Sequence, residues 1–357
     1  MKQEFAEQLL AWWDMHGRHD LPWQQDISPY RVWVSEIMLQ QTQVATVERY
    51  YARFMQTFPD VFTLAAAPQD DVLHLWSGLG YYSRARNLHK AAQQIVAEFK
   101  GELPITLEDM MSLQGVGRST AGAVLALAMD QRQPILDGNA KRVLARFFAV
   151  EGWSGSTANL KTLWGYAEDT TPQARVANYT QAIMDLGATV CSRSRPACND
   201  CPLRSGCAAV AQGLVNEIPA PKPKKVRPRR STVMVIAINK GGDILLEKRP
   251  AQGIWGGLWS FPELAEQADV SDWCQQRLQM LPEAMDSWPM IAHSFSHYDL
   301  DMMPVEIRVS KQPAVIMDGD QWLWYNTRSP ANVGLAAPVA KMLQSLNERP
   351  DTNGPGE

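Results

Sequence analysis

The chain has 357 residues, of which 45% are hydrophobic and 20% charged, and its formal net charge is −4. This length exceeds one ordinary core, so we expect two domains or three, in a soluble globular protein with disorder confined to linkers and ends. No apolar run approaches the roughly 20 residues that span a bilayer, and the N-terminus lacks the pattern of a secretory signal. A membrane or secreted protein is therefore excluded, and we expect a cytoplasmic one.

Helical periodicity dominates the first part of the chain. Apolar residues recur three and four apart in residues 31–58 and 70–80, which is the spacing of one face of an α-helix. After residue 230, two β-rich runs flank a Gly-Gly-Asp turn, as in a hairpin. The sequence therefore predicts an all-α part followed by an α+β part.

A tight turn, Gln-Gly-Val-Gly, separates two short predicted helices. Thr106 with Asp109 three residues later is a capping-box pattern that opens the first helix, and the second begins near Arg118. Gly115 and Gly117 are expected to adopt backbone angles that a Cβ forbids. The uncovered amides at the start of the second helix suit a phosphate of a nucleic-acid backbone, and a helical hairpin without a ligand is the alternative.

A cluster of cysteines with the spacing C-x6-C-x2-C-x5-C predicts a metal site, because disulfides are reduced in the cytoplasm. The candidate ligands are Cys191, Cys198, Cys201 and Cys207. Zinc and a [4Fe–4S] cluster both accept four thiolates, so the spacing leaves both open. Three arginines would offset the charge of such a site and face phosphates, namely Arg193, Arg195 and Arg204. Cys274 is left over and is expected in a core.

A basic, proline-rich segment, "PAPKPKKVRPRR", follows the cysteines. Its prolines prevent a helix or a central strand, so we expect an extended, semi-rigid segment. It marks a domain boundary, either as a solvated spacer or as a strap that also touches phosphates.

The helical hairpin, an aspartate 20 residues after its second glycine and the cysteine spacing together resemble the endonuclease-III-like superfamily of DNA glycosylases. Within it, "LPW", "SEIMLQQTQV", "GLGYYSRARNL" and "MDLGATVC" resemble the MutY family of adenine DNA glycosylases, which act on adenine opposite 8-oxoguanine. The resemblance implies one [4Fe–4S] cluster rather than zinc. It also implies a monomer whose partner is double-stranded DNA with an 8-oxoguanine:adenine or guanine:adenine mispair.

The same resemblance implies a domain organisation. An all-α helix-hairpin-helix catalytic domain spans 1–213, made of a six-helix module at about 29–136 and an iron–sulfur module formed by 1–28 and 137–213. A linker at 214–230 leads to a Nudix, or MutT-like, domain at 231–350 and a disordered tail at 351–357.

Two carboxylates can divide the work of breaking the bond between adenine and deoxyribose. Glu36 stands among apolar residues, where desolvation favours its protonated form, and the resemblance makes it the general acid toward adenine N7. Asp137 is assigned to the sugar cation, as an electrostatic partner or by covalent attack, and Asn139 is grouped with it. A solvated glutamate and an aspartate that only caps a helix are the alternatives.

Ser119 stands where lyase-competent relatives have a lysine that forms a Schiff base with the sugar. Serine cannot form one, so we expect base removal with little or no strand cutting, or weak cutting through another amine such as Lys141. Gln114 stands where the family commonly has proline, and we expect it only to loosen the turn.

The target adenine must leave the base stack to reach these groups. By resemblance, Gln41 and Tyr81 insert beside the orphaned base and Thr42 contacts it, although a buried core tyrosine is the alternative for Tyr81. The adenine pocket is assigned to Trp23, Gln24, Ser119, Gln181 and Asp185. Further DNA contacts are assigned to Gly115, Val116, Gly117, Arg118 and Lys141.

The C-terminal domain lacks the glutamate-rich metal helix of Nudix hydrolases, so we expect it to bind and not to hydrolyse. Phe295, Ser296 and His297 match a recognition loop for 8-oxoguanine, and Ser296 can accept a hydrogen bond from the N7–H that guanine lacks. Exposed strand histidines are the alternative reading of His293 and His297.

A monofunctional adenine glycosylase is therefore the leading hypothesis. A bifunctional glycosylase/lyase for oxidised pyrimidines is disfavoured by Ser119 and by the extra domain. A non-catalytic lesion-binding protein is disfavoured by the paired carboxylates Glu36 and Asp137.

Overall fold

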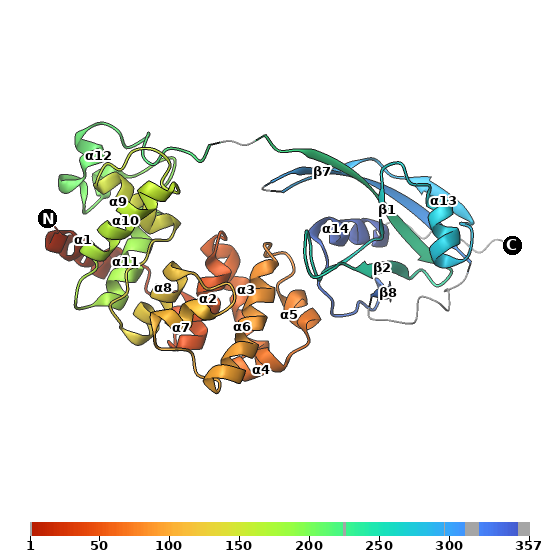
Figure 1. Ribbon diagram of the computed structural model, residues 1–357, viewed down its shortest axis with the longest axis horizontal. Coiled ribbons are helices and arrows are strands. Elements are labelled where there is room, and N and C mark those ends of the chain that lie inside the picture. The colour runs from red at the N-terminus through yellow and green to blue at the C-terminus, as the bar shows by residue number, and fades with distance from the viewer. Residues whose placement is uncertain (1, 224–225, 296, 311–320, 349–357) are drawn as a thin grey trace. The chain divides into compact units, whose positions relative to one another are not determined.

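The computed structural model describes residues 2–223, 226–295, 297–310 and 321–348, and the chain forms two compact units (Figure 1). The helical unit comprises Met1–Ala66 and Asn87–Lys224, and the second unit comprises Ala67–Arg86 and Lys225–Glu357. The chain thus passes between the units within the basic, proline-rich segment, but the second unit also takes in a short piece of the helical sequence. Ser296 and the expected tail at 351–357 lie outside the described residues.

The first 213 residues are helical, as their periodicity predicts. The helices are α1 (Lys2–His16), η1 (Pro22–Gln24), α2 (Pro29–Leu39), α3 (Val44–Thr57), α4 (Val61–Ala66), α5 (Gln69–Leu75), α6 (Ser83–Phe99), α7 (Leu107–Ser112), α8 (Arg118–Met129), α9 (Gly138–Phe147), α10 (Thr157–Thr170), α11 (Val176–Thr189), η2 (Cys198–Asp200), η3 (Arg204–Gly206) and α12 (Ala208–Ala211). None of the helices in the described part of the chain is both long and apolar enough to cross a membrane.

Side-chain caps fix where two of these helices begin. The Ser28 hydroxyl accepts from the Arg31 N–H at 3.3 Å, which starts α2 with Pro29 in its first turn. The Thr106 hydroxyl accepts from the Asp109 N–H at 3.1 Å and donates to the Asp109 carboxylate at 2.7 Å. The predicted opening of α7 is therefore confirmed, because these contacts satisfy amides that a helix start leaves free.

The turn between α7 and α8 differs from expectation at one of its two glycines. Gly115 has φ +80°, and a Cβ there would lie 2.8 Å from Cβ of Asn87, so this position requires glycine. Gly117 has φ −94°, and no atom lies within 4 Å of where its Cβ would stand. The backbone at Gly117 is therefore open to other residues, and what glycine provides there is an uncovered helix start.

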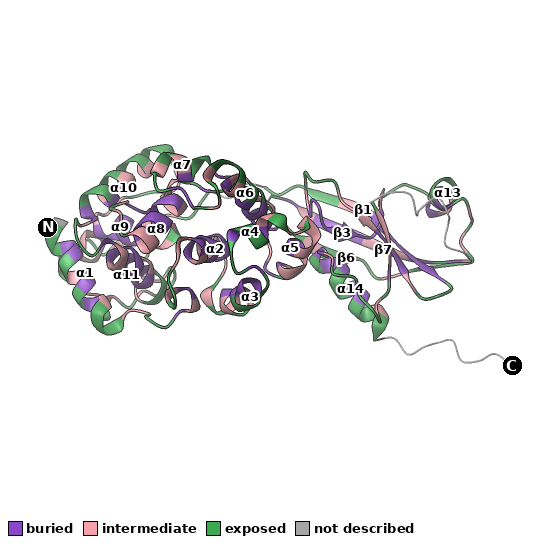
Figure 2. Ribbon diagram, turned by 90° about the horizontal axis from the view of Figure 1, so that it is seen from below, coloured by how far each residue is buried: buried purple, intermediate pink, exposed green. Residues whose placement is uncertain are grey.

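The core of the helical unit brings α1, α9 and α11 together around Leu9, Leu144 and Leu186, which are fully buried. The helices α2 and α8 pack against each other, and most residues of α2 and half of those of α8 are buried (Figure 2). Side chains that emerge from α2, α8, α9 and α11 therefore start from a rigid base.

The second unit contains a mixed sheet of eight described strands. The elements are β1 (Arg229–Asn239), β2 (Ile244–Lys248), β3 (Trp259–Ser260), β4 (Glu263–Ala265), α13 (Val270–Trp273), the π-helical turn η4 (Cys274–Leu278), β5 (Ala284–Ser287), β6 (Ile291–Ser294), β7 (Asp299–Val309), β8 (Trp322–Tyr325) and α14 (Ala337–Asn347). The strand order is β3-β2-β1-β7-β5, with β4 on β1, β6 on β7 and β8 on β2. The central pair, β1 and β7, is parallel, and Val235 lies opposite Val305.

The predicted hairpin is confirmed by β1 and β2, which pair at Ile238 and Ile244 around the Gly-Gly-Asp turn. Cys274 is fully buried in the core of this unit, as expected for a structural cysteine. The start of the basic, proline-rich segment remains attached to the helical unit, because the Ala220 N–H donates to the Gly152 carbonyl at 3.0 Å. Its last arginines, Arg229 and Arg230, already belong to β1.

Candidate active site

A cavity of about 380 Å³ opens between the start of α8, the start of α9, α2 and α11. Both candidate catalytic carboxylates line it, one from α2 and one from the residue before α9. Eight of the predicted site residues lie on its wall: Trp23, Glu36, Gln41, Thr42, Ser119, Asp137, Asn139 and Gln181. Residues distant in sequence thus converge on one concave site, whose wall is about half polar.

Glu36 is half-buried on α2, between the buried side chains of Val32, Trp33 and Ile37. Desolvation raises the pKa of Glu36 to about 8, and the nearby negative charge of Asp137 adds to the shift. At pH 7 the carboxyl is therefore mostly protonated. A protonated carboxyl at the wall of a cavity can donate a proton to a bound base.

Asp137 is the N-cap of α9 and also lines the cavity. Its carboxylate accepts from the Asn139 N–H at 3.0 Å and from the Ala140 N–H at 2.8 Å. These two bonds fix the orientation of the carboxylate at the positive end of the helix dipole. An oriented carboxylate can stabilise a cation that forms beside it.

Ser119 connects α8, the helix that follows the glycine-containing turn, to the segment that carries Asp137. Its hydroxyl accepts from the backbone N–H of Leu136 at 3.0 Å, while Ser119 itself lies in the first turn of α8 and lines the cavity. The hydroxyl therefore ties α8 to the residue that precedes Asp137.

Arg142 is a residue of this region that sequence reasoning did not single out. Its guanidinium donates to Asn139 Oδ1 at 2.8 Å, to the Gly187 carbonyl at 2.5 Å and to the Cys191 carbonyl at 2.7 Å. A Cβ on Gly187 would lie 2.6 Å from Cβ of Asn139, so α11 and α9 touch at this point. No pattern in the sequence distinguishes this arginine from the solvated residues around it.

Gln24 and Asp185, which were predicted to line the adenine pocket, lie behind its wall. Gln24 closes a local loop, since its amide donates to the Arg18 carbonyl at 2.9 Å. Asp185 is 1% exposed and accepts from the Arg18 guanidinium at 2.6 and 2.9 Å and from the Gln181 amide at 2.9 Å. Buried carboxylates need such partners, so Asp185 orients two residues, Arg18 and Gln181, that do line the cavity.

Gln41 and Tyr81 share an uncommon backbone conformation. Their φ angles are +59° and +49°, in the left-handed region that non-glycine residues rarely occupy. Tyr81 is 52% exposed, so the alternative of a buried core tyrosine differs from the structure. Strained, exposed side chains are common at binding surfaces.

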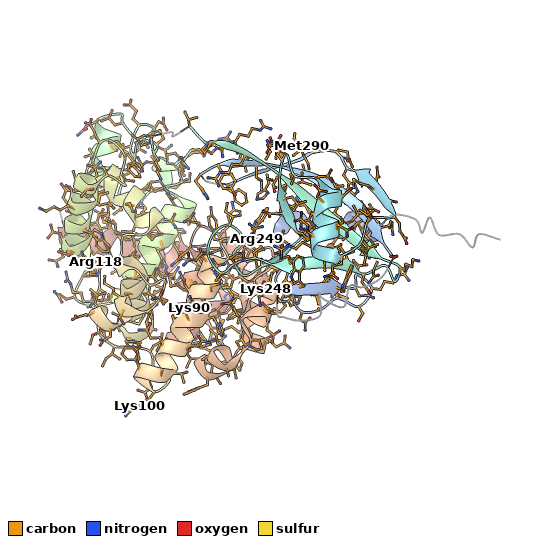
Figure 3. All side chains as sticks on the ribbon, turned by 45° about the vertical axis from the view of Figure 1, so that its right-hand side comes forward. Lys90, Lys100, Arg118, Lys248, Arg249 and Met290 are labelled. Atoms are coloured by element: carbon orange, nitrogen blue, oxygen red, sulfur yellow. The ribbon has the colours of Figure 1, made fainter. Side chains whose placement is uncertain are left out.

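The turn before α8 presents backbone rather than side chains. Val116 is buried, and the Arg118 guanidinium lies 4.0 Å from the Trp164 ring centre and 2.5 Å from Glu168. Arg118 is labelled in Figure 3. An anion at the start of α8 would therefore meet backbone N–H groups first. Lys141, the other predicted DNA contact, is half-buried at the start of α9.

The four clustered cysteines are half-buried and line one apolar cavity of about 30 Å³, together with Val143 and Phe147. The Arg146 guanidinium donates to Cys191 Sγ at 3.3 Å and to the Ser192 carbonyl at 2.7 Å. Arg193, Arg195 and Arg204 are exposed on the same loop. Within the described ranges, no group of three or more His, Cys, Asp and Glu side chains is recognised as able to hold a metal ion.

The candidate recognition loop follows β6 in the second unit. Phe295 packs on Trp255, His293 and Tyr298, with ring centres 5.2, 4.6 and 4.9 Å away. The Phe295 N–H donates to the Tyr298 carbonyl at 2.9 Å, which closes a tight turn, and His297 is exposed. His293 is half-buried, and burial together with Lys341 lowers its pKa, so it differs from a freely solvated histidine.

Comparisons with known proteins match both units. The family model of the HhH-GPD superfamily of base excision DNA repair proteins matches residues 34–168, and that of the NUDIX domain matches residues 233–345. The adenine DNA glycosylase of Buchnera aphidicola (subsp. Acyrthosiphon pisum, strain APS) is 36% identical over 97% of this chain and 99% of its own length. The human adenine DNA glycosylase is 35% identical over 89% of this chain and 70% of its own length.

Solved structures match the helical fold. A thermostable thymine-DNA glycosylase is 25% identical with a TM-score of 0.54 and covers 59% of this chain and 97% of its own. An endonuclease III–DNA complex is 21% identical with a TM-score of 0.50 and covers 60% and 98% of the two chains. The helical fold is thus that of base excision repair enzymes.

Proposed function

The chain belongs to the adenine DNA glycosylase family, and from that premise we propose that it excises adenine mispaired with 8-oxoguanine, and with guanine, as a monofunctional enzyme. The observation that carries the proposal is the pair Glu36 and Asp137 in one cavity, with the pKa of Glu36 raised to about 8. A carboxyl group that keeps its proton at pH 7 beside a second acidic side chain is what acid-assisted cleavage of a glycosidic bond requires.

Glu36 is the general acid. Adenine leaves poorly as an anion, so protonation at N7 lowers the barrier to breaking its bond to the sugar. The apolar flanks of Glu36 keep its proton in place at pH 7, and the cavity wall brings that proton to the base.

Asp137 stabilises the cation that remains on the sugar, aided by Asn139. Both carboxylate oxygens are held by backbone amides, so the negative charge is oriented before the reaction begins. Electrostatic stabilisation and transient covalent attack both fit this position. Water then completes the hydrolysis, and the glycosylase step ends with an abasic sugar.

Ser119 limits the enzyme to base removal. A Schiff base needs an amine, whereas the side chain in this position is a hydroxyl already bonded to Leu136. Lys141 is the nearest lysine in sequence to Asp137 and does not line the cavity, so any strand cutting through it is weak. A bifunctional lyase is accordingly the second candidate.

The flipped adenine enters against Trp23 and Gln181, while Arg18, held by Asp185, completes the wall. Gln41 and Tyr81 fill the duplex at the mispair, and Thr42 contacts the orphaned base. The helix start at Gly115–Gly117 binds a backbone phosphate through its N–H groups. The partner is therefore double-stranded DNA with a mispair, and the site of action is the cytoplasm.

The cysteine loop suits a [4Fe–4S] cluster. Four thiols, an apolar lining and a guanidinium donating to Cys191 Sγ are the donor set and the surroundings that such a cluster takes. When bound, the cluster supplies a rigid cross-link of the loop between α11 and α12. Cys191, Cys198, Cys201 and Cys207 would hold it, and Arg146 would offset part of its charge.

The Nudix domain reads the base opposite adenine. Phe295 and His297 stand on either side of Ser296 in the sequence, and the hydroxyl of a serine can distinguish 8-oxoguanine by its N7–H donor. The aromatic cluster of Trp255, His293 and Tyr298 holds Phe295 in place.

Strand cleavage of a labelled duplex with one 8-oxoguanine:adenine pair tests the proposal. Cutting of the adenine strand only after hot alkali supports base removal without lyase action, and cutting without alkali favours the lyase. A Glu36→Gln variant is expected to bind the duplex and release no adenine. If an iron-loaded wild-type sample releases no adenine, a protein that only binds the lesion is the better reading.

A further inference from the structure

A short piece of the helical sequence, residues 67–86, belongs to the same compact unit as the Nudix domain. It contains α5, the turn that carries Tyr81, and the start of α6. Three separate parts of the Nudix domain contact it: the end of β2, the loop before β3 and the loop before α14.

An ion pair joins α5 to β2. Lys248 Nζ lies 2.9 Å from Asp70 Oδ2, and each side chain is about a quarter exposed. The ammonium also lies 5.6 Å from the ring centre of Trp259, and Lys248 is labelled in Figure 3. Asp70 Oδ1 is buried without a hydrogen-bond partner in the described part of the chain. Lys248 therefore supplies the positive charge that balances the Asp70 carboxylate, whose other oxygen has no hydrogen bond in the described part of the chain.

Close packing joins the same helix to two glycine-containing loops. A Cβ on Gly334 would lie 2.7 Å from Cβ of Leu73. Gly257 has φ +74°, and its Cβ would lie 3.2 Å from the Gln69 amide nitrogen. A side chain at Gly334 would therefore force a shift of Leu73, and the positive φ of Gly257 disfavours any residue other than glycine.

Backbone carbonyls of the Nudix loops accept from side chains on both sides of the Tyr81 turn. Arg86 donates to the Gly256 carbonyl at 2.5 Å, and the Tyr82 hydroxyl donates to the Leu335 carbonyl at 3.4 Å. The Nδ1 of His74 lies 3.3 Å from the Val333 carbonyl. The contacts therefore bracket the turn before and after Tyr81.

Hydrogen bonds among residues 76–84 also stabilise the turn that carries Tyr81. The Gly78 N–H donates to the Tyr82 hydroxyl at 3.2 Å, and the Gly80 carbonyl accepts from both the Trp76 indole and the Arg84 guanidinium at 3.1 Å. Tyr81 has a left-handed backbone conformation, which is unfavourable by itself, so it needs such hydrogen bonds to stabilise it. The tyrosine that contacts the Nudix loop is therefore Tyr82, the residue after Tyr81, and its hydroxyl also helps to hold the turn that carries Tyr81.

We propose that the Nudix domain positions Tyr81, through Asp70 and Lys248 and through the loops at Gly256 and Leu335. Lys248 is then a positioning residue for the insertion of Tyr81 into the duplex, a role that rests on the function proposed above for Tyr81. The domain that reads the base opposite adenine also sets the place of the side chain that inserts beside it.

The test measures the Kd of full-length protein for a duplex with 8-oxoguanine opposite an adenine analogue that cannot be cleaved. Lys248→Met is expected to weaken binding roughly three- to tenfold, since one partner of a partly buried pair is lost. The charge reversal Asp70→Lys with Lys248→Asp is expected to restore most of the affinity. Lys240→Met, at an exposed pair with Glu283, is the matched control and should leave the Kd unchanged.

A double-mutant cycle with Tyr81→Ala separates positioning from a general structural role. If Lys248 acts through Tyr81, Lys248→Met adds no further loss of affinity in the Tyr81→Ala background. Additive losses, or no change in Kd for Lys248→Met, overturn the inference. Asp70→Asn, which removes the charge of the other partner, replaces Lys248→Met if thermal unfolding shows that the latter is not folded.

Failure of the inference and failure of the proposed function remain distinct. Release of adenine by the wild type, followed by hot alkali, reports the function independently of these variants. If Tyr81→Ala binds as the wild type does, the role of Tyr81 is wrong and the inference falls with it, while the glycosylase assignment stands.

Discussion

The hydroxyl of Ser119 accepts a hydrogen bond from the Leu136 N–H at 3.0 Å, and so fixes the first turn of α8 to the residue before Asp137. A lysine in this position would point an amine into the same cavity. We expect Ser119→Lys to cut the strand at the site of adenine removal without alkali, and to be trapped on DNA by borohydride, because an amine can form a Schiff base with the opened sugar. Absence of both products would show that the cavity does not bring position 119 to the sugar.

Ser119→Ala separates the hydrogen bond from the chemistry. The Leu136 N–H is buried and loses its acceptor, so we expect a loss of about 1–3 kcal/mol in the free energy of unfolding, measured by chemical denaturation. Alkali-dependent adenine release should persist, since no step uses the hydroxyl. Complete loss of release in a folded variant would assign the hydroxyl a chemical role.

The pKa of Glu36 predicts how the rate depends on pH. The active form is the protonated one, so single-turnover adenine release should be level below pH 7 and fall as the pH rises through about 8. Above that value the rate should drop about tenfold for each pH unit. A rate that stays level to pH 10 would contradict the assignment of Glu36 as the acid.

The same raised pKa predicts a change in stability. The folded protein holds the Glu36 proton up to about pH 8, whereas an unfolded glutamate loses it near its ordinary pKa of 4.5. Stability should therefore fall as the pH rises between these values. Glu36→Gln removes this loss, so we expect it to be more stable than the wild type by about 1–3 kcal/mol at pH 9, and by much less at pH 4. Calorimetry at both pH values checks this, and an equal difference at both would contradict it.

The Arg18–Asp185 pair is expected to be essential for folding of the site. Arg18→Met leaves a carboxylate that is 1% exposed without its cation, which costs about 3–5 kcal/mol. Arg175→Met breaks the exposed pair with Asp14 and should cost less than about 1 kcal/mol. Urea denaturation measures both, and similar losses would show that burial of Asp185 does not matter.

Arg142 should act on the rate through Asn139. A lysine ammonium offers its N–H donors from a single atom and cannot span the separated acceptors that the guanidinium fork reaches, so Arg142→Lys is expected to release Asn139 and to slow adenine release about tenfold. In an Asn139→Ala background the same change should have little further effect. The iron content of each variant, determined in parallel, reports whether the Cys191 end of the contact has also been lost.

Local signals in the sequence were enough for the helical and α+β parts and for several element boundaries, whereas the eight predicted residues of the cavity wall came mainly from the family resemblance. The caps of α7, the start of α8 and the β1–β2 hairpin depend on neighbouring residues, so their patterns predicted them. The roles of Glu36, Asp137 and Ser119 came from resemblance, and the structure adds their environment. Glu36 is half-buried with a raised pKa, the Asp137 carboxylate caps α9, and the Ser119 hydroxyl accepts from the Leu136 N–H.

Tertiary structure alone decided which residues support the site from behind. Arg18 and Asp185 are 167 residues apart, and Arg142 meets the cysteine loop 49 residues away. Such partners carry no periodicity or spacing, because their pairing depends on how helices pack and not on what stands beside them in the chain. The sequence by itself thus determined the family, the helical and α+β parts and the reactive groups. The fold decided their protonation and orientation, since both depend on burial and on partners that only packing brings together.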